Sequence, residues 1–165
     1  MRLRQRLVDD IPSSIGLRLP RSLGPVVEVD GFCAVATELI PGAPCRQREG
    51  DPDELRRLLT AVASIPTGPI DSLMTEPLEY CGGSDWYRAQ RDDVIPHLEQ
   101  DVRGRAKDAV EALANLGTTR NVFSHGDLAA HNVFWEGDRV TGVLDWDLAS
   151  RSDLSTDLAC VGEGW

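Results

Sequence analysis

Apolar residues recur at every fourth position at the start of the chain, and this spacing predicts a short amphipathic helix. Leu3, Leu7 and Ile11 fall on one face of that helix, and arginines lie between them. Pro12 cannot continue the helix because it lacks a backbone N–H group. The pattern therefore predicts a helix over about residues 1–10.

Two β-prone runs follow, over about 25–30 and 32–39, and they predict an antiparallel hairpin. The runs flank Asp30-Gly31, a dipeptide that readily supplies the positive φ values of a type I′ turn. Pro41-Gly42 is expected to end the second strand.

A capped helix is predicted from residue 52 onward. Asp51 can accept hydrogen bonds from its first turn, Pro52 suits the first helical position, and Glu54 can complete a capping box. Its apolar stripe consists of Leu55, Leu58, Leu59, Val62 and Ile65.

A loop rich in proline and glycine at 66–83 separates this helix from a longer one. Pro96 kinks or divides the longer helix, which continues to about Leu116 and is expected to end at Gly117. Its inward face is expected to hold Val102, Ala106, Ala109, Val110 and Leu113.

The last third of the chain predicts a tight hairpin with polar residues at both ends. Its strands are 133–135 and 140–144, and a turn at 136–139 joins them. A polar loop at 125–132 precedes the first strand, and the polar motif 145–147 directly follows the second.

Composition narrows the class of protein without naming a function. The chain has 165 residues, of which 41% are hydrophobic and 27% charged, as expected of one globular domain or slightly more. Its net charge of −10 gives no general attraction to nucleic acid or to an anionic membrane. No apolar run approaches the ~18 residues of a membrane span. The cysteines form no C-x-x-C pair, so free thiols in a reducing cytoplasm are expected. They are Cys33, Cys45, Cys81 and Cys160.

The polar loop has the form H-x-D-L-x-x-x-N, from His125 through Asp127 to Asn132. Because an antiparallel hairpin returns the chain to its starting end, Asn132 and Asp145 are expected side by side, with Asp127 on the loop leading in. Such oxygen ligands suit Mg²⁺, and a carboxylate that does not bind the metal could accept a proton from a hydroxyl. This arrangement matches the phosphoryl-transfer template of protein kinases. A zinc site around His125 and His131, as in a metallohydrolase, is a remote alternative.

Three motifs occur in order along this part of the chain: His125-Gly126-Asp127 with Asn132, then Gly142 to Asp147, then Asp157-Leu158-Ala159. In these motifs the chain resembles the aminoglycoside phosphotransferase (APH) family of kinase-like small-molecule phosphotransferases. The resemblance implies that Asp127 is the catalytic base and that Asn132 and Asp145 bind Mg²⁺. It also implies that His125 and Asp157 support the catalytic loop structurally.

The same resemblance implies an α+β, protein-kinase-like fold. A partial N-lobe at 1–40 would hold the end of a helix, a β-hairpin and the hinge, and a mostly helical C-lobe at 41–165 would carry the catalytic loop and hairpin. Backbone groups near Glu38, Leu39 and Ile40 would meet the base of ATP or another nucleoside triphosphate. The implied reaction moves the γ-phosphoryl group to a hydroxyl of a small molecule, such as an aminoglycoside or a related amine or sugar.

The chain departs from the family pattern in its N-terminal part. It has no glycine-rich phosphate loop, and its single lysine, Lys107, lies in a predicted C-lobe helix. The chain is therefore expected to be the middle of a kinase-like enzyme, with both ends cut. The alternative is a catalytically silent kinase-like fragment or binding module that lacks the nucleotide-clamping part of the N-lobe.

Overall fold

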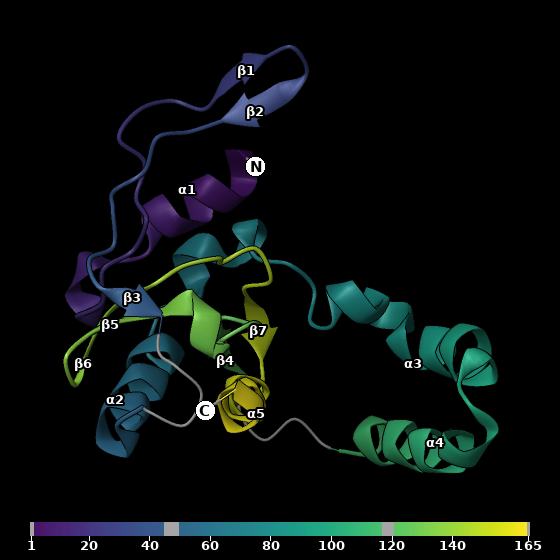
Figure 1. The fold of residues 1–165 in the computed structure, drawn as a ribbon. Coiled ribbons are helices and arrows are strands. Elements are labelled where there is room, and N and C mark those ends of the chain that lie inside the picture. The colour runs from purple at the N-terminus through teal and green to yellow at the C-terminus, as the bar shows by residue number, and fades with distance from the viewer. Residues whose placement is uncertain (1, 45–49, 117–120, 165) are drawn as a thin grey trace. The chain divides into compact units, whose positions relative to one another are not determined.

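The computed structural model describes residues 2–44, 50–116 and 121–164, and it divides the chain into two compact units (Figure 1). The first unit combines Met1–Thr75 with Arg120–Trp165, and the second is Glu76–Thr119. Helices and small antiparallel sheets are mixed in the first unit, as an α+β fold requires. None of the helices in the described ranges has the length and apolar character needed to cross a membrane.

The predicted N-terminal helix is present as α1 (Arg2–Asp10). Leu7, Val8 and Ile11 are buried in the same hydrophobic core as the strands of the C-terminal hairpin. The guanidinium of Arg21 donates to the carbonyls of Val8, Asp9 and Ile11, which lie at the end of the helix. Those carbonyls have no partner within the helix, so Arg21 caps its C-terminus.

The first hairpin pairs β1 (Val27–Val29) with β2 (Phe32–Ala34), so its strands are shorter than predicted. Asp30 and Gly31 have φ values of 52° and 80°, which confirms the predicted type I′ turn. Every residue of the two strands is exposed.

The central sheet has the order β3–β5–β6, all antiparallel. β5 (Val133–Glu136) and β6 (Arg139–Val143) are the predicted hairpin. β3 (Ala43–Pro44) was not predicted, because Pro41-Gly42 was expected to end the strand region. Gly42 makes the pairing possible: its φ is +94°, and a Cβ atom there would lie 2.2 Å from the Trp135 carbonyl oxygen.

The helix α2 (Pro52–Ala63) begins where the sequence predicts. The Asp51 carboxylate accepts hydrogen bonds of 2.9 Å from the N–H groups of Asp53 and Glu54, so it is the N-cap. Leu58 and Val62 are fully buried. The predicted capping box is wrong, because the Glu54 carboxylate turns instead toward β6, where it accepts the N–H of Val140.

A second pair of strands and a C-terminal helix follow in the first unit. β4 (Val122–Ser124) pairs with β7 (Ser150–Ser152), a strand that the sequence analysis did not predict, and α5 (Leu154–Gly164) follows it. The loop after β4 and the turn after β6 carry the polar motifs.

The second unit is helical and differs in detail from the prediction. α3 (Trp86–Arg88) runs into a π-helical stretch (Ala89–Val94) and a 3₁₀ turn (Ile95–His97), and α4 (Gln100–Ala114) follows. The division at Pro96 is confirmed. The expected inward face of α4 is at most half-buried, and Ala109 and Leu113 are exposed. Gly117 and Cys45 lie outside the described residues.

Candidate active site

The loop between β4 and β5 makes a close approach at Gly126. This residue has a φ of +82°, and a Cβ atom there would lie 2.3 Å from the carbonyl oxygen of Leu148. Only glycine tolerates both conditions without strain. The sequence H-G-D therefore brings Asp127 close to the segment that follows β6.

The carboxylate of Asp157, on α5, is hydrogen bonded to residues at the start of the same loop. This carboxylate accepts hydrogen bonds from Ser124 Oγ at 3.0 Å, His125 N at 2.9 Å and Gly126 N at 3.0 Å. Asp157 is 1% exposed. Its three donors come from consecutive residues, so the buried carboxylate fixes the backbone immediately before Asp127.

The fully buried His125 ring connects the two polar motifs. Its Nδ1 accepts the N–H of Asp127 at 3.2 Å, and its Nε2 lies 2.9 Å from the carbonyl oxygen of Leu144. A carbonyl oxygen can only accept a hydrogen bond, so Nε2 carries a proton. Nδ1 accepts a hydrogen bond and therefore carries none, so the ring is neutral. Burial lowers the pKa of His125 below its usual value near 6.5, although the negative charge of Asp157 acts in the opposite direction.

Asn132 is the residue that brings the two motifs together. Its Nδ2 donates to both the carbonyl oxygen and the Oδ2 of Asp127, each at 3.0 Å. The N–H of Leu144, which directly precedes Asp145, donates to the Asn132 carbonyl at 2.8 Å. The amide nitrogen is thus engaged, and Oδ1 is the atom that can act as a ligand for a cation.

Asp145 has a left-handed backbone, with φ of 58°. The next residue, Trp146, is 2% exposed, donates from Nε1 to the Val143 carbonyl at 3.0 Å, and packs against Phe123 and His125. An aspartate in this conformation is strained, and such strain is found where the surroundings hold a functional residue in place. The buried indole supplies that constraint, and the Asp145 side chain is exposed.

The expected hinge residues lie on the segment before β3. The N–H of Glu38 donates to the Arg21 carbonyl at 2.8 Å, so this group is not available to a nucleotide base. Leu39 is 89% exposed, whereas Ile40 is buried and its Cγ2 lies close to Gly142 of β6. Ile40 of the expected hinge segment therefore lies beside β6.

His131 and Asp147, two other polar residues of these motifs, are exposed. Lys107 lies on α4, where its Nζ is 3.9 Å from Glu111 Oε1. Both ring nitrogens of His125 are hydrogen bonded, which does not suit a zinc ligand. Within the described ranges, no group of three or more His, Cys, Asp or Glu side chains is arranged to hold a metal ion.

Comparison with known proteins assigns the family. The sequence profile of the phosphotransferase enzyme family, APH, matches residues 5–165. The chain belongs to this family. The resemblance seen in the H-G-D and D-W-D motifs is thereby confirmed.

Relatives of the APH chain agree with this assignment. It is 26% identical to viomycin phosphotransferase of Streptomyces vinaceus over 92% of its own length and 58% of the relative's. The solved structure of aminoglycoside 2′-phosphotransferase-IIIa with GDP superimposes with a TM-score of 0.74 at 16% identity, over 98% of this chain and 61% of that one. A ternary complex of aminoglycoside phosphotransferase APH(4)-Ia with ADP and hygromycin B gives 0.69 at 18% identity, over 97% and 60%. The kinase-like fold is confirmed, and the chain spans about 60% of the length of these relatives.

Sequence reasoning missed some of the groups that build the site. Ser124 donates to Asp157, and the backbone of Leu144 bonds both His125 and Asn132. A serine at a strand end carries no signal of its own in the sequence. The role of Leu144 could have been anticipated only from its place before Asp145 in the expected hairpin.

Proposed function

We propose that this chain carries the phosphoryl-transfer site of an ATP- and magnesium-dependent small-molecule kinase. The observation that carries the proposal is the position of Asn132, which is hydrogen bonded to Asp127 and lies beside Leu144-Asp145. A base, an amide oxygen and a second carboxylate are then within reach of one reacting group. Membership of the phosphotransferase family supports the same reaction class.

Asp127 is the group that would accept the proton of the acceptor hydroxyl. Its Oδ2 accepts from Asn132, which fixes the carboxylate plane and leaves Oδ1 to face the acceptor. The hydrogen bond from the Asp127 N–H to the neutral His125 holds the backbone at this point. A positioned carboxylate of this kind orients the attacking oxygen and removes its proton during transfer.

The residues present fit a magnesium ion. The Asn132 Oδ1 and the Asp145 carboxylate are hard oxygen donors, and Mg²⁺ typically takes one or two such protein ligands together with water and phosphate oxygens. When bound, the ion offsets negative charge on the phosphates. The strained backbone of Asp145 supports its assignment as a ligand.

The nucleotide and the acceptor complete the proposal. ATP or another nucleoside triphosphate would lie against the hinge segment, at the Glu38 carbonyl and the backbone of Leu39 and Ile40. The acceptor is a hydroxylated small molecule, an aminoglycoside or a related amine or sugar. The net charge of −10 of the chain suits a cationic acceptor of this kind. We place the protein in the cytoplasm, where ATP is available and free thiols such as Cys33 stay reduced.

The test is phosphoryl transfer from labelled ATP by the full chain, with and without magnesium. The acceptor panel consists of viomycin, hygromycin B, other aminoglycosides and homoserine. We expect magnesium-dependent labelling of at least one acceptor, and Asp127→Asn should lower the rate by about 10²–10⁴-fold because the proton acceptor is lost.

Asp138→Asn is the matched control, since Asp138 is an exposed carboxylate at the opposite end of the same hairpin. This variant should keep the full rate. Absence of transfer by the unmodified chain would favour the catalytically silent alternative, and equal rates for Asp127→Asn and the unmodified chain would exclude Asp127 as the base.

A further inference from the structure

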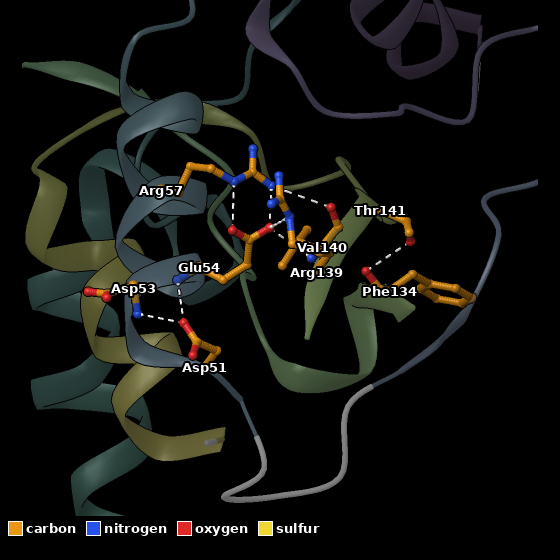
Figure 2. A network of polar contacts seen from close by, with 8 residues as sticks. All are labelled: Asp51, Asp53, Glu54, Arg57, Phe134, Arg139, Val140 and Thr141. Atoms are coloured by element: carbon orange, nitrogen blue, oxygen red, sulfur yellow. Dashed lines mark hydrogen bonds and ion pairs between the residues drawn. The ribbon is translucent and has the colours of Figure 1, made fainter. Parts of the chain in front are cut away.

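The helix α2 holds an ion pair between a buried carboxylate and a partly exposed arginine, and this pair faces the hairpin β5–β6 (Figure 2). The Glu54 carboxylate accepts from Arg57 Nε at 2.9 Å and Arg57 Nη2 at 2.7 Å, and Arg139 lies 3.4 Å away. Glu54 is only 8% exposed, and its pKa is lowered below the usual 4.5, chiefly by the hydrogen bonds from Arg57. A buried carboxylate with this number of cationic partners is ionised.

This ion pair is hydrogen bonded to the backbone of β6 at one residue, Val140. Glu54 Oε1 accepts the N–H of Val140 at 3.0 Å, and Arg57 Nη2 donates to the Val140 carbonyl at 3.3 Å. We call Glu54, Arg57 and the Val140 backbone the α2 clamp. It engages both polar groups of one strand residue, as a neighbouring strand would do at a sheet edge.

A second ion pair on the same helix provides an internal comparison for the clamp. Asp53 and Arg56 have the same i,i+3 spacing and an ion pair of 2.9 Å, but both side chains are more than three-quarters exposed. Both partners of that pair belong to α2. Burying the Glu54 charge carries a desolvation cost that Asp53 avoids, and the contact with β6 is what distinguishes the two pairs.

The hairpin beside the clamp has an irregular register. A bulge separates Phe134 from Trp135, so Val133 pairs with Val143 and Phe134 with Gly142, whereas Trp135 pairs with Val140. At a bulge one strand accommodates an extra residue, and a shift of one residue in register would turn every side chain of a strand to the opposite face. β6 ends at Val143, three residues after Val140 and roughly 10 Å further at about 3.3 Å per residue, and Asp145 follows two residues later.

We infer that Glu54 is a positioning residue, and that the α2 clamp holds β6 in the one register that presents Asp145 beside Asn132. This inference rests on the proposed function, because it assigns the clamp a purpose in the assembly of that site. Thr141 reinforces the same register, since its hydroxyl donates to the Pro41 carbonyl at 2.6 Å and also lies 3.0 Å from the Phe134 carbonyl oxygen.

The test compares Glu54→Ala with Asp53→Ala in the full chain. Amide hydrogen exchange is followed at Leu144, whose N–H bonds the Asn132 carbonyl at the far end of the hairpin. We expect Glu54→Ala to accelerate exchange at Leu144 by at least tenfold more than at Leu58 or Val161, and Asp53→Ala to leave all three unchanged. Glu54→Gln should act in the same direction by a smaller factor, because its amide oxygen can still accept from Val140, and it serves if Glu54→Ala does not fold.

Binding of magnesium-ATP is the second readout. Glu54→Ala should raise the dissociation constant by roughly 2–30-fold, the range that coupling through a packed network produces. Exchange at Leu144 that rises no more than elsewhere would overturn the inference, as would an unchanged dissociation constant in a variant with faster exchange. If the unmodified chain does not bind magnesium-ATP, the proposed function fails, and exchange at Leu144 still decides whether the clamp sets the register.

Discussion

Two residues of the proposed active site, Gly126 and Asp145, adopt left-handed backbone conformations. Gly126 does so without cost, and its missing side chain admits the Leu148 carbonyl. Asp145 does so at a cost of about 1–2 kcal/mol, because its Cβ crowds a carbonyl oxygen. The first conformation sets the path of the loop, and the second aims a carboxylate, so the two positions are not interchangeable.

A comparison of Gly126→Ala with Gly137→Ala separates the cost of a left-handed backbone from the cost of a close approach to a carbonyl oxygen. Gly137, in the hairpin turn, has a φ of +56° and open space around it, so alanine there should cost only the backbone strain of about 1–2 kcal/mol. At Gly126 the added methyl also meets a backbone oxygen, so we expect the free energy of unfolding to fall by at least about 1 kcal/mol more than at Gly137. Chemical denaturation of the full chain measures both. Equal losses in the two variants would show that the close approach to Leu148 does not constrain the loop.

The proposed catalytic residues were predictable from the sequence because their types and spacing match a known phosphoryl-transfer motif. Asp127 and Asn132 lie on one loop, and the hairpin signal placed Asp145 near them before any coordinates were known. Their partners were less predictable. The contact of His125 with the Leu144 carbonyl depends on a turn geometry that no residue type in the sequence reports.

Among the elements, α5 stabilises the loop that carries Asp127 through one carboxylate. Asp157 lies in its first turn, and accepts from Ser124 at the end of β4 and from the backbone N–H groups of the next two residues. An interior carboxylate with three donors can be replaced only at the cost of leaving at least one donor without an acceptor.

Asp157→Asn should therefore lower the free energy of unfolding by about 2–3 kcal/mol, since an amide supplies one acceptor oxygen where the carboxylate supplies two. Asp153→Asn is the control, because Asp153 accepts from Ser155 near the start of α5 and asparagine caps a helix start as well as aspartate does. Thermal or chemical denaturation checks the difference. A loss no larger than that of Asp153→Asn would contradict the assigned support.

Long, periodic elements were predictable and short strands were not. α1, α2 and both hairpins follow from apolar spacing, a cap and turn dipeptides. β3 and β7 have two and three residues, and they exist only because distant strands pair with them. The capping box failed for a related reason: the Glu54 carboxylate pairs with Arg57 on its own helix and with Arg139 and the Val140 N–H on β6, and the contacts with β6 are tertiary.

At the scale of the whole molecule, the N-terminal residues share a core with the C-terminal hairpin. Leu7, Leu17 and Leu19 are buried in the same cluster as Val133 and Val143. The division into lobes at residues 1–40 and 41–165 stays a prediction. The first unit nevertheless contains Glu38 to Ile40, the α2 clamp and the loop that carries Asp127. We propose that this unit forms a site for a magnesium-bound nucleotide.

Calorimetry of ATP binding to the full chain, with and without magnesium, tests this claim most directly. We expect binding that requires magnesium, and Asp145→Asn should weaken it by about 10–100-fold because a charged metal ligand is lost while the size of the side chain is kept. Asp138→Asn should bind as the unmodified chain does. Binding that is absent, or that is equally strong in Asp145→Asn, would contradict the account.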